Sequence, residues 1–220
     1  MILCIDNLLP PEALAEAQAA LRRIRFEDGA RTAGWHARLV KANRQAAAND
    51  THAAALRRSG QAALEANELF RLAVRPRRLG PLLISRYDEG HGYGPHVDDA
   101  LMGEARSDVS FTLFLSPPGD YDGGELVLDS TAGERSFKLG AGALVLYPST
   151  TLHRVETVTR GTRFALVGWA QSLVRDPAKR ELLFDLETAR RAMFDKGGKT
   201  PEFDLVSKSL TNLLRRWAEP

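Results

Sequence analysis

The amino-acid sequence predicts a mainly β fold, a sandwich or jelly roll, with helices on both sides of the β region. Between residues 79 and 175, short runs rich in β-branched and aromatic residues recur about every 10 to 15 residues, separated by Gly, Pro and Asp. The segments before and after this region have the 3.6-residue period of amphipathic helices. We therefore expect a helical and strand region over 1–78 that packs on the core, a β core over 79–175 and a helical extension over 176–220.

Two helices are expected before the β core. Residues 11–25 place apolar side chains on one face after a Pro-Pro start, and Asp28-Gly29 follows as a stop signal. A second helix is expected over 51–72, with a cap at Asp50 or Thr51 and an interruption at Gly60.

Strands of the core are expected over residues 82–87, 109–116, 125–128, 142–147, 152–158 and 163–170. The glycine-rich segment 90–95 is expected to form a mobile rim. After residue 176 the helical period returns, stops at Lys196-Gly197-Gly198 and resumes over 203–217. The apolar stripe of these last helices needs a cover, which is either their own domain or a homo-oligomer interface.

The composition excludes several classes of protein. Cys4 is the only cysteine, which rules out an internal disulfide and a cysteine-rich zinc site and fits a cytoplasmic protein. A net charge of +2 indicates no nucleic-acid partner. No segment approaches the roughly 18 consecutive apolar residues of a membrane span. Residues 87–130 are strongly acidic, which fits either attraction of a cation or basic substrate, or solvated loops.

The string His96-Val97-Asp98 can bring two metal ligands together. On an extended segment, residues two apart point to the same side, so an imidazole and a carboxylate can reach one ion. Such a tripeptide is a weak signal alone. It is strengthened by His153, which lies 55 residues after Asp98 in an expected strand, and by Arg163, which follows 10 residues later.

Two histidines and one carboxylate, with further coordination positions open, describe a non-haem Fe(II) site that activates oxygen. The planar guanidinium of Arg163 suits a carboxylate held through two hydrogen bonds. A dicarboxylate that chelates iron at one end needs such an anchor at the other. Taken singly, His153 fits a structural core histidine and Arg163 a surface ion pair, but the combination favours the iron site.

The chain also carries a series of short motifs in order: Tyr87-Asp88-Glu89-Gly90, His96-Val97-Asp98-Asp99-Ala100, Phe111-Thr112-Leu113-Phe114-Leu115-Ser116, Tyr121-Asp122-Gly123-Gly124-Glu125-Leu126, Leu146-Tyr147-Pro148-Ser149, Leu152-His153-Arg154-Val155 and Thr159-Arg160-Gly161-Thr162-Arg163. Further matches lie over 26–29, Thr32-Ala33-Gly34, 40–41 and 169–176. Over nearly its whole length the chain thus resembles the bacterial PKHD-type hydroxylases, which are Fe(II)- and 2-oxoglutarate-dependent dioxygenases of the prolyl 4-hydroxylase type.

This resemblance implies a double-stranded β-helix of jelly-roll type, with His96, Asp98 and His153 as the iron ligands and Arg163 as the anchor of 2-oxoglutarate. It implies hydroxylation of a substrate C–H bond with release of succinate and CO₂, and ascorbate as reductant. An amino-acid side chain, a peptide or a small molecule would fit as substrate. No nucleic-acid or membrane partner is expected.

The residues expected to assist Arg163 in binding 2-oxoglutarate differ from those of this family. Many relatives place a hydroxyl-bearing residue two positions after the arginine, where this chain has Ala165, and some prolyl hydroxylases carry a tyrosine where Phe114 stands. Another hydroxyl must then assist the co-substrate, or 2-oxoglutarate binds more weakly. Thr112 and Tyr87 are the candidates, although Tyr87 also fits an ordinary residue at the core edge.

Two other classes of protein remain open at this point. One is a cupin-like metal-binding protein without oxygenase activity, against which Arg163 argues. The other is a non-catalytic β-sandwich binding module with helical flanks, for which bound iron is not expected.

Overall fold

The computed structural model describes residues 1–32, 34–35 and 37–219. Ala33, His36 and Pro220 lie outside the described residues, so the middle residue of the matching segment Thr32-Ala33-Gly34 does too.

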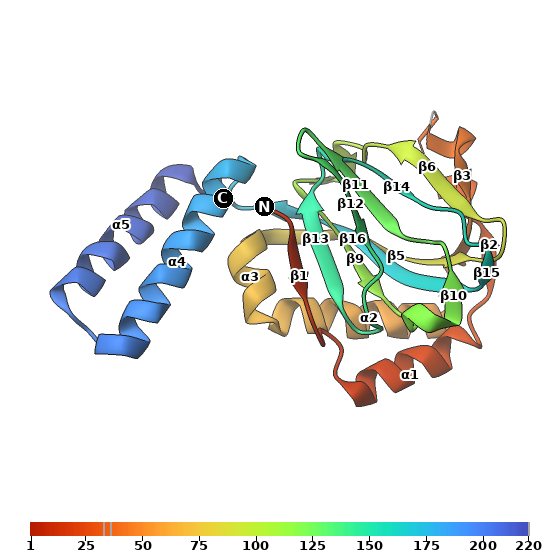
Figure 1. Cartoon of the computed structure of the whole chain (residues 1–220), viewed down its shortest axis with the longest axis horizontal. Helices are drawn as coiled ribbons and strands as arrows, with labels where there is room; N and C mark the ends of the chain where they lie inside the picture. The colour runs from red at the N-terminus through yellow and green to blue at the C-terminus, as the bar shows by residue number, and fades with distance from the viewer. Residues whose placement is uncertain (33, 36, 220) are drawn as a thin grey trace.

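A larger and a smaller antiparallel sheet face each other and form a jelly-roll core (Figure 1). The larger sheet contains, in spatial order, β1 (Leu3–Ile5), β13 (Leu144–Pro148), β9 (Val109–Phe114), β16 (Arg163–Ser172), β5 (Pro76–Tyr87), β4 (Arg44–Ala46) and β2 (Phe26–Asp28). The smaller sheet contains β12 (Gly133–Phe137), β11 (Leu126–Ser130), β14 (Leu152–Val155), β6 (Gly92–His96) and β3 (Lys41–Ala42). Short ladders pair β10 (Tyr121–Asp122) with β15 (Arg160–Gly161) and β7 (Leu101–Met102) with β8 (Ala105–Arg106). The mainly β, jelly-roll fold expected from the sequence is confirmed.

Helices cover the outer face of the larger sheet (Figure 1). They are α1 (Pro11–Leu21), α2 (Thr51–Ala66) and α3 (Glu68–Val74), and short 3₁₀ turns occupy Gly29–Thr32, Ala37–Leu39 and Pro118–Asp120. Buried side chains of these helices, such as Leu56, Leu64 and Phe70, share one hydrophobic cluster with the outward residues of the sheet. Burying such large apolar side chains stabilises the fold by about 1.5–3 kcal/mol each.

Strand β9 is buried on both faces, and its successive side chains point alternately to the hydrophobic core and to the cavity between the sheets. Phe111 and Leu113 pack in the cluster beneath the helices, whereas Ser110 and Thr112 point to the space between the sheets. Strand β16 behaves in the same way, because Leu166 packs with the helices while Arg163 faces the interior. The sequence thus places polar groups inside the jelly roll on strands that otherwise look like ordinary core.

The expected interruption of the second helix at Gly60 is wrong. Helix α2 runs through Gly60, where a Cβ atom would lie 2.9 Å from Leu166 Cδ1, so the glycine lets the helix approach the sheet closely. Helix α2 ends before Asn67 instead, and α3 begins after it. The side-chain oxygen of Asn67 accepts a hydrogen bond from the backbone amide of Phe70 at 2.8 Å and so caps α3.

The expectation of a mobile rim over residues 90–95 is also wrong in part, because Gly92–His96 forms strand β6 between β14 and β3. The glycines permit close backbone packing: a Cβ atom on Gly94 would lie 2.8 Å from Val40 Cβ. Strands were expected somewhere in the helical and strand region over 1–78, but the sequence did not locate them. The structure places β1 to β4 there, and they extend both sheets with N-terminal residues.

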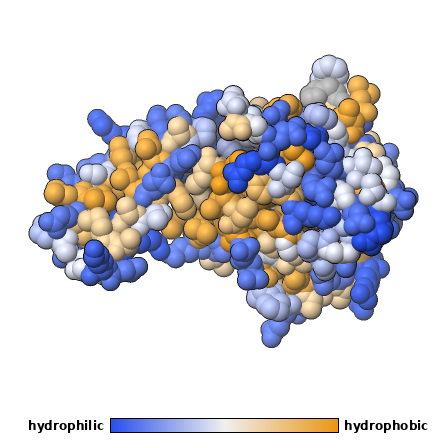
Figure 2. Space-filling model, viewed as in Figure 1, coloured by the Kyte–Doolittle hydropathy of each residue, from blue (hydrophilic) through white to orange (hydrophobic). Residues whose placement is uncertain are grey.

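The C-terminal helices α4 (Pro177–Gly197) and α5 (Pro201–Trp217) pack on each other and project from the β core (Figure 1). Val174, Leu183 and Leu210 form a small hydrophobic cluster of their own there. Figure 2 shows hydrophobic side chains on the visible face of this projection, and Leu182 and Leu205 are among the exposed apolar residues of its helices. Across the described residues, none of the helices has both the length and the apolar character that crossing a membrane would require.

Candidate metal and co-substrate site

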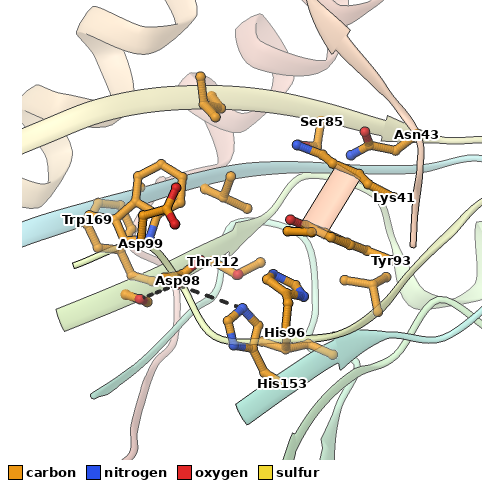
Figure 3. A pocket seen from close by; sticks show the side chains of 18 of the residues that line it. Lys41, Asn43, Ser85, Tyr93, His96, Asp98, Asp99, Thr112, His153 and Trp169 are labelled. Carbon is orange, nitrogen blue, oxygen red and sulfur yellow. Dashed lines mark hydrogen bonds and ion pairs between the residues drawn. The ribbon is translucent and has the colours of Figure 1, made fainter. Parts of the chain in front are cut away.

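The structure brings the predicted ligand residues together on the smaller sheet. His96 ends β6, His153 lies on β14, and these two residues face each other in the strand register. Asp98 follows β6, and its Oδ2 atom lies 3.8 Å from Nε2 of His153. One ligand atom from each of the three side chains lies within 4.8 Å of the others, which suits one shared metal ion (Figure 3).

Backbone carbonyls orient both imidazole rings. Nδ1 of His96 lies 2.8 Å from the carbonyl oxygen of Gly94, and Nδ1 of His153 lies 3.0 Å from that of Thr151. Because a carbonyl only accepts hydrogen bonds, each ring holds its proton on Nδ1 and presents the lone pair of Nε2. Burial, together with the neighbouring His153, lowers the pKa of His96 to about 4, so that ring is neutral and able to coordinate a metal at pH 7.

The carboxylate of Asp98 is held by a hydroxyl that sequence reasoning missed. Ser110 Oγ donates a hydrogen bond to Asp98 Oδ2 at 2.6 Å and lies 2.8 Å from Ser149 Oγ. Ser110 is 2% exposed, and its position on the inner face of β9 was the available signal. Such outer contacts fix the orientation of a ligand carboxylate.

A cavity of about 280 Å³ opens beside these ligands between the two sheets. It is lined by all three ligand candidates, and by Arg163, Tyr87 and Thr112. The residues that the sequence assigned to the metal and to 2-oxoglutarate therefore share one cavity, although they come from strands far apart in the chain.

Arg163 is 1% exposed, and its Nε and Nη1 atoms have no hydrogen-bond partner among the described residues. The guanidinium carbon lies 5.1 Å from the ring centre of Tyr87 and 5.4 Å from that of Phe114. Two buried guanidinium nitrogens without hydrogen-bond partners cost stability, so these donors fit an anionic ligand. The ordinary surface ion pair considered from the sequence is wrong for Arg163.

Both hydroxyl candidates lie inside the site. Tyr87 is 3% exposed and pairs with Arg163 in the register of β5 and β16, and burial raises the pKa of its phenol. Thr112 is also 3% exposed. Sequence reasoning did not single out Tyr147, which lines the same cavity at 3% exposed and whose pKa burial raises well above the ordinary value.

Trp169, Lys41 and Tyr93 form further walls of this cavity. Trp169 is 8% exposed, so it is both a core residue and a cavity residue. Tyr93 stacks on His96 with ring centres 3.6 Å apart. Lys41, Asn43 and Gln45 line the cavity from the short strands β3 and β4 and the residue between them, and the sequence did not locate these strands.

A second cavity, of about 640 Å³, lies between the core and the C-terminal helices. Asp98 borders it on the core side, and Lys179 and Trp217 border it on the helical side. Arg180 fastens this junction, because its guanidinium donates to the carbonyl oxygens of Val174 and Asp108 at 2.8 and 3.2 Å. The C-terminal helices thus border a cavity that extends to Asp98, one of the three ligand candidates.

Comparisons with known proteins agree with this geometry. Residues 82–171 match the model of the 2OG-Fe(II) oxygenase superfamily. The chain is 57% identical to a PKHD-type hydroxylase of Acaryochloris marina over 219 residues, and 54% identical to one of Gloeothece citriformis over 221 residues, with full coverage of every chain. The fold is similar to a crystal structure of a Pseudomonas putida prolyl-4-hydroxylase, with a TM-score of 0.54 and 20% identity over 78% of this chain and 92% of that chain.

These relatives decide between the classes that the sequence left open, because the identity extends over the whole chain rather than over the β core alone. Neither a cupin-like protein without oxygenase activity nor a β-sandwich binding module accounts for sequence identity to hydroxylases over the full chain. The chain belongs to the PKHD-type hydroxylases and is an Fe(II)- and 2-oxoglutarate-dependent dioxygenase.

Proposed function

We propose that this enzyme hydroxylates a C–H bond of a small molecule or peptide and converts 2-oxoglutarate to succinate and CO₂. His96, Asp98 and His153 hold Fe(II), and Arg163 binds the distal carboxylate of 2-oxoglutarate. Tyr87 and Thr112 assist that carboxylate with their hydroxyl groups. Ascorbate acts as the reductant that keeps the iron divalent.

One observation carries the proposal: a three-ligand cluster and a buried guanidinium with unpaired donors line the same cavity. The ligand set is the one that open non-haem iron sites use, and the guanidinium offers paired donors to a carboxylate. When bound, Fe(II) supplies the activation of oxygen that hydroxylation needs.

The residues of this chain have separate tasks in that reaction. The carbonyls behind His96 and His153 fix which nitrogen of each ring faces the metal, and Ser110 fixes Asp98. Arg163 orients the co-substrate from the far end of the cavity. The walls around it, including Tyr147 and Trp169, keep water away from the reacting groups.

The test is a screen that follows succinate formation with Fe(II), 2-oxoglutarate, ascorbate and candidate substrates. We expect succinate only when Fe(II), 2-oxoglutarate and oxygen are all present, and faster formation with a true substrate. His153→Ala serves as the matched control for iron-dependent turnover. Succinate formation that persists in His153→Ala at the wild-type rate would refute the site.

The remaining properties follow from the sequence and are part of the proposal. The enzyme works in the cytoplasm, and its partner is the substrate rather than a nucleic acid or a membrane. If it forms a homo-oligomer, the C-terminal helices α4 and α5 provide the interface, since they expose apolar side chains.

A further inference from the structure

We infer that Asp99 binds a positively charged group of the substrate, so that the enzyme acts on an organic cation such as a primary amine. This inference rests on the proposed function, because it names the substrate class of the same cavity. It adds a specificity-determining residue that belongs neither to the ligand set nor to the co-substrate anchor.

Asp99 presents an unpaired carboxylate to the reaction cavity. It directly follows the ligand Asp98 in the chain and lines the same cavity. Ser107 Oγ donates a hydrogen bond to the backbone carbonyl oxygen of Asp99, which fixes the backbone there. No described residue forms a hydrogen bond or an ion pair with its side-chain oxygens. The carboxylate lies so close to Gly34 that a Cβ atom on that glycine would be 3.2 Å from Oδ2 of Asp99.

The other charged side chains that line the cavity are already engaged. Among the described residues these are Lys41, Asp98 and Arg163. The two positive charges of Fe(II) and the one of Arg163 match the carboxylate of Asp98 and the two carboxylates of 2-oxoglutarate. Lys41 interacts within the chain, with Nζ 5.1 Å from the ring centre of Tyr93, and Figure 3 shows it on the opposite side of the ligand set from Asp99. The loaded cavity is therefore neutral as a whole, but negative where Asp99 lies.

Trp169 suits the rest of such a substrate. Figure 3 shows it on the same side of the ligand set as Asp99. Trp169 is 8% exposed, and its Nε1 atom has no hydrogen-bond partner among the described residues. A buried indole N–H without a partner costs free energy unless a ligand or water accepts its hydrogen bond. This side of the cavity thus combines a negative charge, a neutral donor and an aromatic wall, which are groups that recognise ammonium ligands.

The wall at Trp169 is also apolar, as a hydrocarbon chain requires. Met102 lines the cavity as well, and it lies near Trp169 because both approach Gly80. A Cβ atom on Gly80 would be 3.3 Å from the carbonyl oxygen of Trp169 and 3.8 Å from Cβ of Met102. A substrate that places its ammonium group on Asp99 can therefore pack its carbon chain on these two residues.

The surroundings of the cavity also favour a cation. Residues 87–130 contain ten acidic residues and one basic residue, Arg106. A surface with this excess of negative charge attracts cations over several ångströms. Of these ten acidic residues, Asp98 and Asp99 line the cavity. Since Asp98 is a metal ligand, Asp99 is the residue that connects the acidic region to the substrate.

The inference is tested with protein that carries Zn(II) in place of Fe(II) and is saturated with 2-oxoglutarate, so that no turnover occurs. The probes are hexylammonium and the neutral 1-hexanol, and ligand-observed NMR measures their affinities at pH 7. We expect hexylammonium to bind at least about threefold more tightly than hexanol, because a partly exposed ion pair contributes less than a buried one. Asp99→Asn should remove the difference, Asp99→Glu should retain it, and Asp99→Lys should reverse it.

A second measurement locates the bound probe. With Mn(II) in the metal site, the unpaired electrons of the ion increase the relaxation rates of protons that lie near it. We expect this increase for hexylammonium with the wild-type protein and its loss in Asp99→Asn. Asp129→Asn, at an exposed position of β11, is the matched control and should behave like the wild type in both measurements.

The inference is overturned if both probes bind equally, if neither binds, or if Asp99→Asn keeps the preference for hexylammonium. Binding of hexylammonium without faster relaxation also overturns it, because the probe would then lie outside the reaction cavity. Loss of the metal or of 2-oxoglutarate affinity in Asp99→Asn would assign Asp99 to the metal and co-substrate site instead. Failure of the proposed function is seen separately, as unchanged 2-oxoglutarate affinity in Arg163→Lys.

Discussion

His96 and His153 face each other across the antiparallel strands β6 and β14, and their ring centres lie 4.2 Å apart. Each ring is held from behind by a carbonyl two residues earlier in the chain. Two cross-strand neighbours with the same local support thus form a pair of metal ligands, next to a shift in the strand register between His153 and Val155. The third ligand, Asp98, is supplied by the same segment as His96.

Removing any one ligand should abolish tight binding of Fe(II). We expect His96→Ala, Asp98→Ala and His153→Ala to lose the metal, because two remaining protein ligands cannot retain a labile ion. Elemental analysis of the folded variants measures this. His52→Ala, on the exposed side of α2, is the control and should keep its iron. A variant that stays fully loaded identifies a residue that is not a ligand.

Replacing Arg163 should change the affinity for 2-oxoglutarate and the stability of the ligand-free protein in opposite directions. Arg163→Lys keeps the charge but loses the planar fork, so 2-oxoglutarate affinity should fall roughly tenfold or more. Arg163→Met should bind 2-oxoglutarate weakly as well, yet stabilise the ligand-free protein by about 1 kcal/mol or more, because it removes buried unpaired donors. Calorimetric titration and thermal unfolding measure the two effects. A less stable Arg163→Met protein would show that the guanidinium is well paired.

Gly124→Ala should damage the anchor indirectly. Gly124 has a φ angle of +68°, and a Cβ atom there would lie 3.0 Å from Cδ of Arg163 and 3.1 Å from the Tyr121 ring. Alanine therefore strains the backbone and displaces the arginine. We expect lower stability by about 1–3 kcal/mol and weaker 2-oxoglutarate binding with iron retained. Gly119→Ala, where a Cβ meets nothing within 4 Å, should bind 2-oxoglutarate like the wild type.

Lys41 should titrate well below an ordinary lysine. NMR of ¹³C-labelled lysine side chains in the metal-free protein should place its pKa near 8, with Lys41→Met giving the assignment. Asp98→Asn should lower the pKa further, because the Asp98 carboxylate favours the charged amine. Since the folded pKa lies below the unfolded value of 10.5, this group costs stability at neutral pH, and that cost is relieved as pH rises from about 8 to 10.5. A pKa above 10 would contradict the burial of Lys41.

Truncation after Arg175 should destabilise the β core. It removes Arg180 and with it the hydrogen bonds to the carbonyls of Val174 and Asp108, and it uncovers Val174, which is fully buried. We expect aggregation, a lower melting temperature or a changed oligomeric state, measured by light scattering and thermal unfolding. A truncated protein that keeps its size and melting temperature but loses turnover would show that the segment serves catalysis.

The sequence by itself determined the fold class and the set of chemical groups. The strands of the core are local patterns, and His96 with Asp98 is a local juxtaposition of residues two apart on an extended segment. Arg163 was placed in the expected last strand of the core, and its role as co-substrate anchor followed from its combination with the ligand motif and from the family resemblance, whereas its burial is known only from the structure. These conclusions need only the periodicity of a strand and the order of motifs in the chain.

The tertiary structure decided which polar groups face the cavity and how the helices end. Lys41 and Gln45 lie on strands too short to give a pattern, and Asn43 lies between these strands. All three residues line the cavity because the chain crosses there from the smaller to the larger sheet. By helix propensity Gly60 predicts a break, yet it lies within helix α2. The helix packs so closely on the sheet at this point that a side chain at residue 60 would collide with Leu166, which explains the glycine. Local propensities amount to about 1 kcal/mol, so contacts made by residues distant in the chain override them.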